Sequence, residues 1–280
     1  MEILHLINNG SQELKHKGIT SHQLDSEILL SKVLNKTREQ LIINSNQKVE
    51  SKKIALFNTL LKRRSSREPI AYILREKEFW SKNFFVDYNT LIPRPETELM
   101  VEKIVKIFKN KKIFALDIGT GTGCILLSVL SELRHSKGIG VDISQKAIKK
   151  AIQNSKKHKL TERIKFFNKS FSEIYNVKFD LIVSNPPYIK KKDLKNLKDD
   201  IKKFEPKLAL DGGNDGLDVI KKVIYKSKSI LKIKGMLALE IGNEQYKKVS
   251  KILKRNNFKT KFLVKDCREN IRCILSTLEN

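Results

Sequence analysis

The chain has 280 residues, of which 40% are hydrophobic and 31% are charged, a balance typical of a globular protein with one large domain or two ordinary ones. No apolar run reaches the roughly 18 residues that a membrane span needs, and the N-terminus lacks the basic and apolar regions of a signal peptide, so we expect a cytoplasmic protein. Cys124, Cys267 and Cys273 form neither a paired framework nor a CxxC motif, so the sequence predicts neither a disulfide scaffold nor a metal site.

The net charge of +26 produces a field that attracts nucleic acid and acidic protein surfaces. The lysines are scattered along the chain, with a denser run in residues 190–207. A solvated lysine-rich surface is the simpler interpretation, and nonspecific contact of that surface with nucleic acid stays open. The charge alone therefore assigns no nucleic-acid substrate, and the function does not require nucleic-acid binding.

Residues 1–82 are predicted to form a small helical domain. Leu24, Ile28 and Leu29 recur near helical spacing, and residues 49–63 hold a second apolar pattern of this kind. The region contains no glycine-rich or phosphate-binding loop, so we do not expect it to carry the chemistry.

A hairpin linker is predicted in residues 83–95, where aromatic and β-branched residues surround a turn. From residue 96 to residue 280 the pattern alternates between helix and strand. Short apolar runs that suit strands occupy residues 112–117, 138–142, 164–168, 180–184 and 236–240, and residues 258–265 and 271–275 suit a closing strand pair. The intervening stretches are long enough for helices, so the sequence predicts an α/β domain built on a parallel sheet.

A glycine-rich turn follows the first of these strands. It consists of Gly119, Thr120, Gly121, Thr122 and Gly123, and it precedes a predicted helix. Glycine lets the backbone approach a ligand closely, and open α/β sheets bind ligands at the carboxyl ends of their strands. The spacing is G-x-G-x-G, whereas dinucleotide enzymes use G-x-G-x-x-G, so the turn favours S-adenosylmethionine as the cofactor.

Two side chains beyond the turn are candidates for binding the adenosine part of that cofactor. Asp142 ends the second strand, 25 residues after Asp117, and its carboxylate can accept hydrogen bonds from both ribose hydroxyls. The alternative is that Asp142 only caps the following helix. Phe171 follows the third strand and can stack on the adenine, although a core position suits a phenylalanine nearly as well.

The segment Asn185-Pro186-Pro187-Tyr188 follows the fourth strand and is the most informative about the reaction. Proline has no N–H, and Pro187 restricts Pro186 to an extended conformation, so the turn is stiff and its polar groups are mainly acceptors. The Asn185 side-chain oxygen and the Pro186 carbonyl suit a planar NH2 group, whereas a carboxylate would place lone pairs against lone pairs. Tyr188 is expected to form an aromatic wall over the planar group.

These residues indicate a direct displacement at the methyl group of a sulfonium. An amide nitrogen is a poor nucleophile because its lone pair is delocalised. Asn185, Pro186 and Tyr188 are therefore the predicted catalytic residues, which hold the nitrogen in line with the methyl group. Positioning of this kind can lower a barrier by about 7–11 kcal/mol at best. No strong base is required before the attack, and the sequence offers no obvious one.

Taken together, these motifs resemble a known family. Residues 119–123, Asp142 and residues 185–188 resemble the motifs of class I amino-methyltransferases. Residues 91–98 (Leu-Ile-Pro-Arg-Pro-Glu-Thr-Glu) resemble the inter-domain signature of the release factor glutamine methyltransferases, the PrmC/HemK family. Further segments match the same family, namely residues 67–73, 78–80, 205–206, 208–210, 212–217 and 240–242, so the resemblance spans roughly residues 20–275.

The resemblance implies both a fold and a reaction. The fold would be a Rossmann-like class I methyltransferase sheet, mostly parallel with an antiparallel closing strand, preceded by a small N-terminal helical domain. The enzyme would move a methyl group from S-adenosylmethionine to the side-chain amide nitrogen (N5) of the glutamine in the Gly-Gly-Gln motif of class 1 peptide chain release factors. The helical domain would dock the release factor, and residues 96–280 would form the methyltransferase domain.

The resemblance also assigns the site residues. The cofactor would contact Gly119, Thr120, Gly121, Thr122, Gly123, Asp142, Phe171 and Asn185, and the substrate glutamine would contact Asn185, Pro186, Pro187 and Tyr188. The chain departs from the family at Ser170-Phe171, where many members have Asp-Trp. Phenylalanine can still stack, whereas Ser170 lacks the carboxylate that would meet the adenine amino group. The high lysine content is also unusual.

Two other functions stay open. An adenine-N6 DNA or RNA methyltransferase would use the same acceptors on an exocyclic amine, and the positive charge would suit it, but no added target-recognition domain is evident. A non-catalytic basic binding module would need a defunct cofactor pocket, yet every glycine of the turn and Asp142 are present. Salt-sensitive DNA binding would favour the first alternative, and failure to bind S-adenosylmethionine would favour the second.

Overall fold

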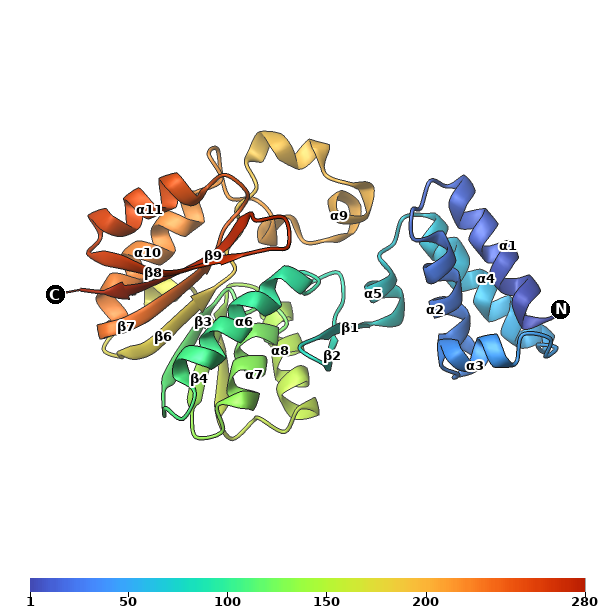
Figure 1. Cartoon of the computed structure of the whole chain (residues 1–280), viewed down its shortest axis with the longest axis horizontal. Coiled ribbons are helices and arrows are strands. Elements are labelled where there is room, and N and C mark those ends of the chain that lie inside the picture. The colour runs from blue at the N-terminus through green and yellow to red at the C-terminus, as the bar shows by residue number, and fades with distance from the viewer. Residues whose placement is uncertain (280) are drawn as a thin grey trace. The chain divides into compact units, whose positions relative to one another are not determined.

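The computed structural model describes residues 1–279 and divides into two compact units (Figure 1). The first unit comprises Met1–Glu76 together with Lys198–Phe204, and the second comprises Lys77–Leu197 and the chain from Glu205 onward. The first break therefore follows residue 76, close to the domain boundary expected after residue 82. A separate role for each unit stays a prediction.

The first unit is helical, as expected. Its helices are α1 (Ile3–His16), α2 (His22–Leu34), α3 (Arg38–Ile43), α4 (Ser51–Ser65), α5 (Ile70–Leu74) and α9 (Asp199–Phe204). Apolar residues recur at helical spacing on the longer helices, so these helices bury one face in a shared core. Fully buried side chains of this core include Ile3, Leu14, Leu29, Leu30 and Phe57.

A buried arginine ties α9 to the other helices of the first unit. Arg64 Nε donates to Asp25 Oδ2 at 2.7 Å, and Arg64 Nη1 donates to Asp200 Oδ2 at 2.9 Å. Arg64 and Asp25 are both buried, and a buried charge is tolerated only when it is paired. This pairing explains why a segment from far along the chain belongs to the first unit.

A two-stranded hairpin lies earlier in the chain than the sequence predicted. Its strands are β1 (Glu76–Phe79) and β2 (Lys82–Phe85), so only the second strand overlaps the expected range of 83–95. The rest of that range forms no strand. Pro93 and Pro95 lack the N–H that pairing between strands requires. The prediction of a hairpin gave too little weight to this effect of proline.

The second unit is built on a seven-stranded sheet, and every predicted strand is present. In chain order the strands are β3 (Phe114–Ile118), β4 (Lys137–Asp142), β5 (Ile164–Asn168), β6 (Phe179–Ser184), β7 (Leu231–Glu240), β8 (Phe258–Lys265) and β9 (Ile271–Leu278). Their order across the sheet is β5-β4-β3-β6-β7-β9-β8. Strands β3 to β7 pair in parallel, and β9 pairs antiparallel with both β7 and β8. The predicted fold class is confirmed.

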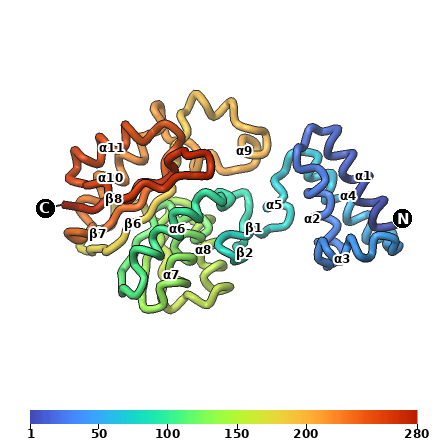
Figure 2. The backbone as a smooth tube through the Cα atoms, in the orientation of Figure 1, coloured from blue at the N-terminus to red at the C-terminus, as the bar shows by residue number. Residues whose placement is uncertain are grey.

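Helices cover both faces of this sheet (Figure 2). One face carries α6 (Pro95–Phe108) and α7 (Cys124–Glu132), with α8 (Gln145–Lys157) beside α7, and the other face carries α10 (Asp218–Ile230) and α11 (Tyr246–Arg255). Short 3-10 helices occur as η1 (Phe171–Glu173), η2 (Lys191–Asn196) and η3 (Lys207–Ala209). Successive strand residues point to opposite faces, so Leu181 and Val183 enter the core under α6 and α7, whereas Ile182 enters the other core. Burial on both faces explains why the strands are continuous apolar runs.

The carboxyl ends of β3, β4 and β6 meet at one edge of the sheet. In the register, Ile118 pairs with Val141 on one side and with Ser184 on the other. The chain builds outward from β3 in one direction through β4 and β5, and then in the other direction through β6 and β7. Open α/β sheets bind ligands where the strand order reverses in this way, which is where the predicted site residues lie.

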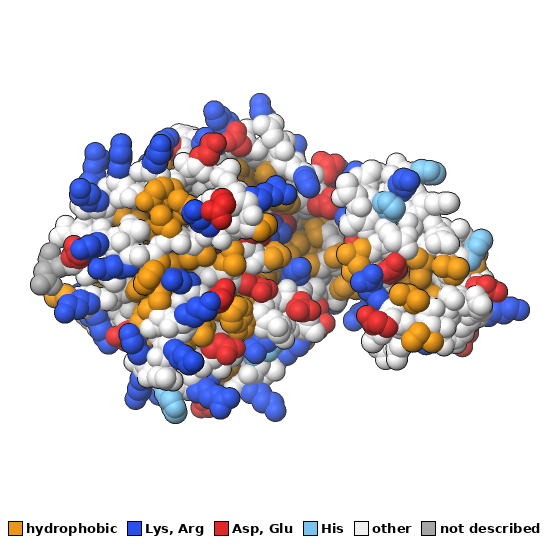
Figure 3. All heavy atoms as spheres, in the orientation of Figure 1, with side chains coloured by type: hydrophobic (Ala, Val, Ile, Leu, Met, Phe, Trp, Pro, Cys, Tyr) orange, Lys and Arg blue, Asp and Glu red, His pale blue; other side chains and the backbone are white. Residues whose placement is uncertain are grey.

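Basic side chains are spread over the visible surface and form no single patch there (Figure 3). In residues 1–279, no helix combines the length and the apolar character that crossing a bilayer requires. Across the same residues, no group of three or more His, Cys, Asp or Glu side chains is placed to hold a metal ion.

Candidate active site

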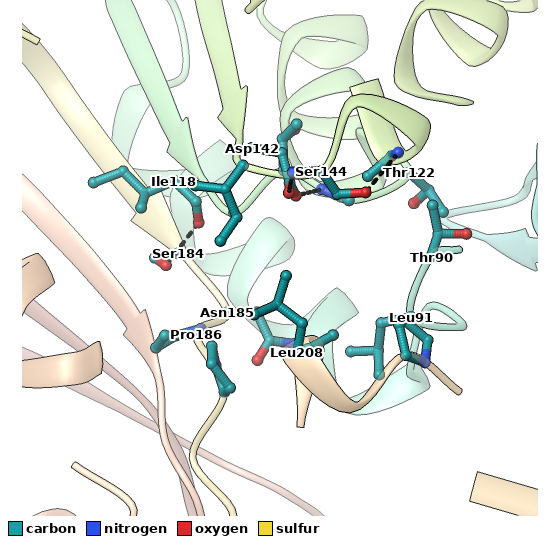
Figure 4. Close-up of a pocket in the computed structure, with 18 of the residues that line it drawn as sticks. Thr90, Leu91, Ile118, Thr122, Asp142, Ser144, Ser184, Asn185, Pro186 and Leu208 are labelled. Carbon is teal, nitrogen blue, oxygen red and sulfur yellow. Dashed lines mark hydrogen bonds between the residues drawn. The ribbon is translucent and has the colours of Figure 1, made fainter. Parts of the chain in front are cut away.

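A pocket of about 260 Å³ lies in the second unit beside the carboxyl ends of β3, β4 and β6 (Figure 4). Asp142 and Ser144 lie on one side of it, and Asn185 and Pro186 lie on the other. The predicted site residues that line it are Gly119, Thr120, Gly121, Thr122, Asp142, Phe171, Asn185, Pro186 and Pro187. Gly123 and Tyr188 are not among the lining residues.

The glycine turn forms one wall of the pocket. Gly119 and Gly121 have φ values of 72° and 54°, which glycine adopts without strain. A Cβ at either position would meet no atom within 4 Å, so both positions face open space. At Gly123, by contrast, a Cβ would lie 3.0 Å from Leu127 and 3.2 Å from Phe166. The turn therefore presents bare backbone to a ligand, and Gly123 supports it from behind.

Asp142 holds the glycine turn in place. Its Oδ2 accepts a hydrogen bond from the Gly121 N–H at 3.0 Å, and its Oδ1 accepts one from the Ser144 N–H at 2.8 Å. Ser144 is the residue that caps α8, since its hydroxyl accepts from the Ala147 N–H at 3.2 Å. Asp142 is therefore not the helix cap. A carboxylate has about four lone-pair sites, so Asp142 retains acceptor capacity toward the pocket.

Phe171 lines the pocket just beyond β5 and also packs partly against the core under α10. Both roles weighed for this ring suit its position, and stacking on adenine stays a prediction. Ser170, which stands where many family members have Asp, forms hydrogen bonds within the adjacent 3-10 helix η1. Its Oγ accepts from the Ser172 N–H at 3.2 Å, and the Glu173 carboxylate accepts from the Ser170 N–H at 2.9 Å. Ser170 therefore caps η1.

The Asn-Pro-Pro-Tyr turn forms the wall opposite Asp142. It starts where β6 ends, at Ser184, whose hydroxyl donates to the Ile118 carbonyl at 2.8 Å and ties the two strand ends together. Asn185 is half-buried and Pro186 is buried, and both line the pocket. The predicted acceptors are therefore brought to the same pocket as the glycine turn.

Tyr188 lies behind this turn. Its ring packs against the core under α10, and a Cβ at Gly242 would lie 3.0 Å from its Cδ2. Burial raises the pKa of Tyr188 to about 12, so its phenol stays neutral and provides no base. In the structure Tyr188 supports the turn, and its role as an aromatic wall stays a prediction.

A glycine-rich loop at residues 212–217 packs against the back of the same turn. A Cβ at Gly216 would lie 2.5 Å from the Tyr188 carbonyl oxygen. Gln245 joins the pieces, because its Nε2 donates to the carbonyls of Tyr188 and Gly216 at 3.0 and 3.1 Å, and its Oε1 accepts from the Gly242 N–H at 2.9 Å. The turn is therefore held from behind by close packing and hydrogen bonds.

Residues expected to serve as a linker form a third wall. Leu91, Ile92, Pro93 and Arg94 all line the pocket. Arg94 Nη2 donates to Glu205 Oε1 at 2.5 Å, and the Ile92 N–H donates to Glu205 Oε2 at 3.2 Å. Because the Glu205 carboxylate is buried, it fixes this segment firmly within the second unit.

A buried carboxyl group lies beneath the glycine turn. Asp117 is 1% exposed, and its Oδ2 accepts from the Thr120 hydroxyl at 2.8 Å, while its Oδ1 has no hydrogen-bond partner among the described residues. Burial raises the pKa of Asp117 to about 7. Burial of a charged carboxylate costs free energy, so the protonated form of this group is favoured up to about neutral pH.

Two family models match the chain. The PrmC N-terminal domain matches residues 5–74, and the methyltransferase small domain matches residues 95–205. The release factor glutamine methyltransferase of Buchnera aphidicola subsp. Acyrthosiphon pisum is 41% identical over 258 residues, which are 92% of this chain and 92% of that protein. The chain belongs to the release factor glutamine methyltransferase family.

Other members of the family extend the comparison. The release factor glutamine methyltransferase of Fusobacterium nucleatum is 38% identical over 98% of this chain and 78% of its own length. The bifunctional methyltransferase of Rickettsia typhi is 35% identical over 97% of this chain, but the match covers 56% of that protein. This chain therefore spans about half the length of the bifunctional relatives.

Solved structures support the fold. The hMettl16 catalytic domain, solved in complex with the MAT2A 3'UTR hairpin 6, matches with a TM-score of 0.58 over 82% of this chain and 83% of its own, at 14% identity. The ribosomal protein L11 methylase of Lactobacillus delbrueckii subsp. bulgaricus matches with a TM-score of 0.52 over 69% and 82%, at 16% identity. At this identity the likeness concerns the class I methyltransferase fold alone.

The cofactor of this methyltransferase is S-adenosylmethionine, and the residues present fit it. Gly119 and Gly121 leave open space over their backbone, as close approach of a ligand requires. Asp142 keeps acceptor capacity for ribose hydroxyls and lines the pocket beside the glycine turn. Which residues touch which part of the cofactor stays a prediction.

The sequence interpretation missed three residues that support the site. Thr97 and Glu240 were noted only within matching segments, and Gln245 was not singled out. Each is buried, and each forms a hydrogen bond either to the Asn-Pro-Pro-Tyr turn or to a residue that is bonded to this turn. The available signal was position, since Glu240 ends a central strand and Thr97 opens a helix beside the same edge of the sheet.

Replacing Gly216 with alanine is expected to displace the Asn-Pro-Pro-Tyr turn. The added Cβ would collide with the Tyr188 carbonyl oxygen, and the φ of 75° is unfavourable for alanine. We expect the rate of methyl transfer to fall by about tenfold or more, while the cofactor Kd stays within about threefold. The matched control is Gly18→Ala, which also has a positive φ but faces only the end of the Arg67 side chain. Equal rates for the two variants would contradict the supporting role of Gly216.

Replacing Asp117 with asparagine is expected to stabilise the cofactor-free protein above neutral pH. The pKa of about 7 in the folded protein exceeds the ordinary aspartate value of 3.8, so the stability of the natural protein falls as pH rises between these values and then levels off. A tenfold change in proton affinity corresponds to about 1.4 kcal/mol, so we expect the variant to gain on the order of 1–3 kcal/mol at about pH 8 and almost nothing at about pH 4. Denaturant unfolding at both pH values measures the difference. An equal gain at both values would show that the carboxyl charge is not its source.

Proposed function

We propose that this chain transfers a methyl group from S-adenosylmethionine to the N5 amide nitrogen of the glutamine in the Gly-Gly-Gln motif of class 1 peptide chain release factors. The observation that carries the proposal is one pocket with a cofactor wall and a facing wall of hydrogen-bond acceptors (Figure 4). The glycine turn and Asp142 make the first wall, and Asn185 and Pro186 make the second. Relatives that cover most of the chain carry the name of this activity.

The acceptor wall selects a planar NH2 group. One N–H of the glutamine amide donates to Asn185 Oδ1 and the other to the Pro186 carbonyl. These bonds increase the electron density on the nitrogen and fix its direction of attack. A carboxylate in the same place would leave buried acceptors without donors, which costs about 1–3 kcal/mol for each group.

The remaining walls align the reactants and exclude water. When bound by the glycine turn and Asp142, S-adenosylmethionine would supply an electrophilic methyl group. The methyl–sulfur bond would break as the nitrogen–methyl bond forms, S-adenosylhomocysteine would leave as a neutral thioether, and the nitrogen would then lose its extra proton to bulk solvent. Leu91, Ile92 and Leu208 line the pocket with apolar surface, which keeps water from competing for the hydrogen bonds of the amide. Tyr188 stays neutral at physiological pH, so the proposed reaction uses positioning and not a strong base.

The proposal extends to the partner and its location. The first unit docks the release factor, in keeping with the match of residues 5–74 to the PrmC N-terminal domain. Nucleic-acid binding is not required, and any contact through the basic surface would be nonspecific. Because class 1 release factors act on translating ribosomes, we place the reaction in the cytoplasm.

The test offers labelled S-adenosylmethionine and three acceptors in parallel. These are a purified class 1 release factor, the same factor with Gln→Ala in its Gly-Gly-Gln loop, and duplex DNA. We expect label on the unmodified release factor alone. Label on DNA would favour the adenine-N6 alternative, and cofactor binding without label on any acceptor would mean that the substrate is wrong.

A further inference from the structure

A chain of hydrogen bonds runs from Asn185 into the interior of the second unit. Asn185 Nδ2 donates to Thr97 Oγ1 at 3.4 Å, and the Thr97 hydroxyl donates to Glu240 Oε2 at 2.6 Å. Thr97 and Glu240 are 2% and 4% exposed, so water does not compete for these contacts. Helix α6, strand β7 and the turn that follows β6 bring the groups together.

The number of protons in this chain fixes the direction of each bond. Burial raises the pKa of Glu240 to about 7, and above that pH its ionised carboxylate only accepts hydrogen bonds. A threonine hydroxyl has a single proton to donate. Thr97 donates that proton to Glu240, so toward Asn185 it acts only as an acceptor. Asn185 must then turn its NH2 toward Thr97, which leaves Oδ1 free to face the pocket.

Shape alone would not choose this orientation. The oxygen and nitrogen of a carboxamide are nearly the same size, so packing tolerates either rotamer, and hydrogen bonds decide between them. If Asn185 were flipped, its NH2 would meet the NH2 of the substrate amide, donor against donor. The acceptor wall would then be reduced to the Pro186 carbonyl.

We propose that Glu240, acting through Thr97, sets the orientation of the Asn185 carboxamide so that its oxygen faces the substrate amide. Thr97 and Glu240 are positioning residues, because they act through Asn185 and not on the reacting atoms. The inference rests on the proposed function for its kinetic consequence, while the orientation itself is independent of the substrate. It also assigns a shared role to two segments, residues 91–98 and 240–242, that lie far apart in the sequence.

The kinetic test compares Thr97→Val with Thr97→Ser at about pH 8, where Glu240 is ionised. Valine keeps the shape of threonine and removes the hydroxyl, whereas serine keeps the hydroxyl. We expect Thr97→Val to lower kcat by about 10- to 100-fold and Thr97→Ser to stay within about threefold of the natural enzyme. The KM for the release factor and the cofactor Kd should change by no more than about threefold in both, since the fold and the pocket walls remain. Equal kcat values for the two variants would overturn the proposal.

A second variant tests the acceptor at the end of the chain. In Glu240→Gln, the new side-chain amide can donate to the Thr97 hydroxyl. Thr97 can then donate its own proton to the Asn185 oxygen, so the hydrogen bonds no longer favour one orientation of the Asn185 carboxamide. We expect a fall in kcat of about tenfold or more with the release-factor KM nearly unchanged. A kcat equal to that of the natural enzyme would contradict a role for the carboxylate.

A readout without activity separates this inference from the proposed function. The side-chain NH2 signals of Asn185 can be assigned in NMR spectra by their absence from Asn185→Ala. We expect these protons to exchange with solvent at least about tenfold more slowly in the natural protein than in Thr97→Val, because buried acceptors hold them. Equal exchange in both proteins would overturn the orientation. If the natural enzyme labels no release factor, the proposed function fails, and the exchange comparison still decides the orientation.

Discussion

Asn185→Ala is expected to lower kcat by about 10²- to 10³-fold, the effect typical of removing one preorganised polar group that acts in the transition state. The substitution removes the Oδ1 acceptor that is aimed at the reacting nitrogen, while Pro186 and the glycine turn remain. Asn185 was also predicted to contact the cofactor, but most of the cofactor wall is formed by other residues. We therefore expect the cofactor Kd to stay within about threefold, as measured by calorimetry beside single-turnover kinetics.

The matched control for this variant is Asn196→Ala. Asn196 is an exposed asparagine in η2 and does not line the pocket, so the same substitution there should leave turnover unchanged. An equal loss of turnover and of cofactor affinity in Asn185→Ala would assign Asn185 to cofactor binding alone.

Asp142→Ala is expected to raise the cofactor Kd by about 100-fold or more. The variant loses the carboxylate that we expect to accept from the ribose hydroxyls, and hydrogen bonds to a charged group contribute about 1.5–3 kcal/mol each. It also loses the bond from the Gly121 N–H that holds the glycine turn. Calorimetric titration with S-adenosylmethionine measures the change, and kcat at saturating cofactor should fall much less.

Asp142→Asn separates these contributions. Asparagine keeps one side-chain oxygen, which can still accept from Gly121, so we expect a Kd increase of about tenfold, between those of the natural enzyme and the alanine variant. A cofactor Kd that is unchanged in both variants would mean that Asp142 serves only the local backbone.

The sheet could be predicted because its signals are local. Strands that are buried on both faces are short continuous apolar runs, and the stretches between them suit helices, so β3 to β9 were found from the pattern. The glycine turn, Asp142 and Asn185 could be placed at one edge because the carboxyl ends of parallel strands converge there. The predicted hairpin of residues 83–95 overlaps the observed one only in β2, because the aromatic and β-branched content beyond residue 85 resembles that of strands.

The features that the sequence did not reveal depend on contacts between distant residues. Arg64 and Asp200 are separated by 136 positions, and their ion pair brings residues 198–204 into the first unit. Thr97 and Glu240 are separated by 143 positions, and nothing local to either one indicates a bond to the other. The position of Tyr188 behind its own turn is likewise set by tertiary packing, which a four-residue motif does not encode.

The most direct test of the central claim locates the transferred methyl group. A class 1 release factor is incubated with the enzyme and S-adenosylmethionine, digested, and sequenced by tandem mass spectrometry. We predict a mass increase of one methylene unit on the glutamine of the Gly-Gly-Gln motif, retained in fragments that contain the side-chain nitrogen. At an early time point, the modified fraction should be about 10²- to 10³-fold lower when Asn185→Ala replaces the natural enzyme. A methyl group on any other residue, or the same glutamine modified equally by the Asn185→Ala enzyme, would contradict the account.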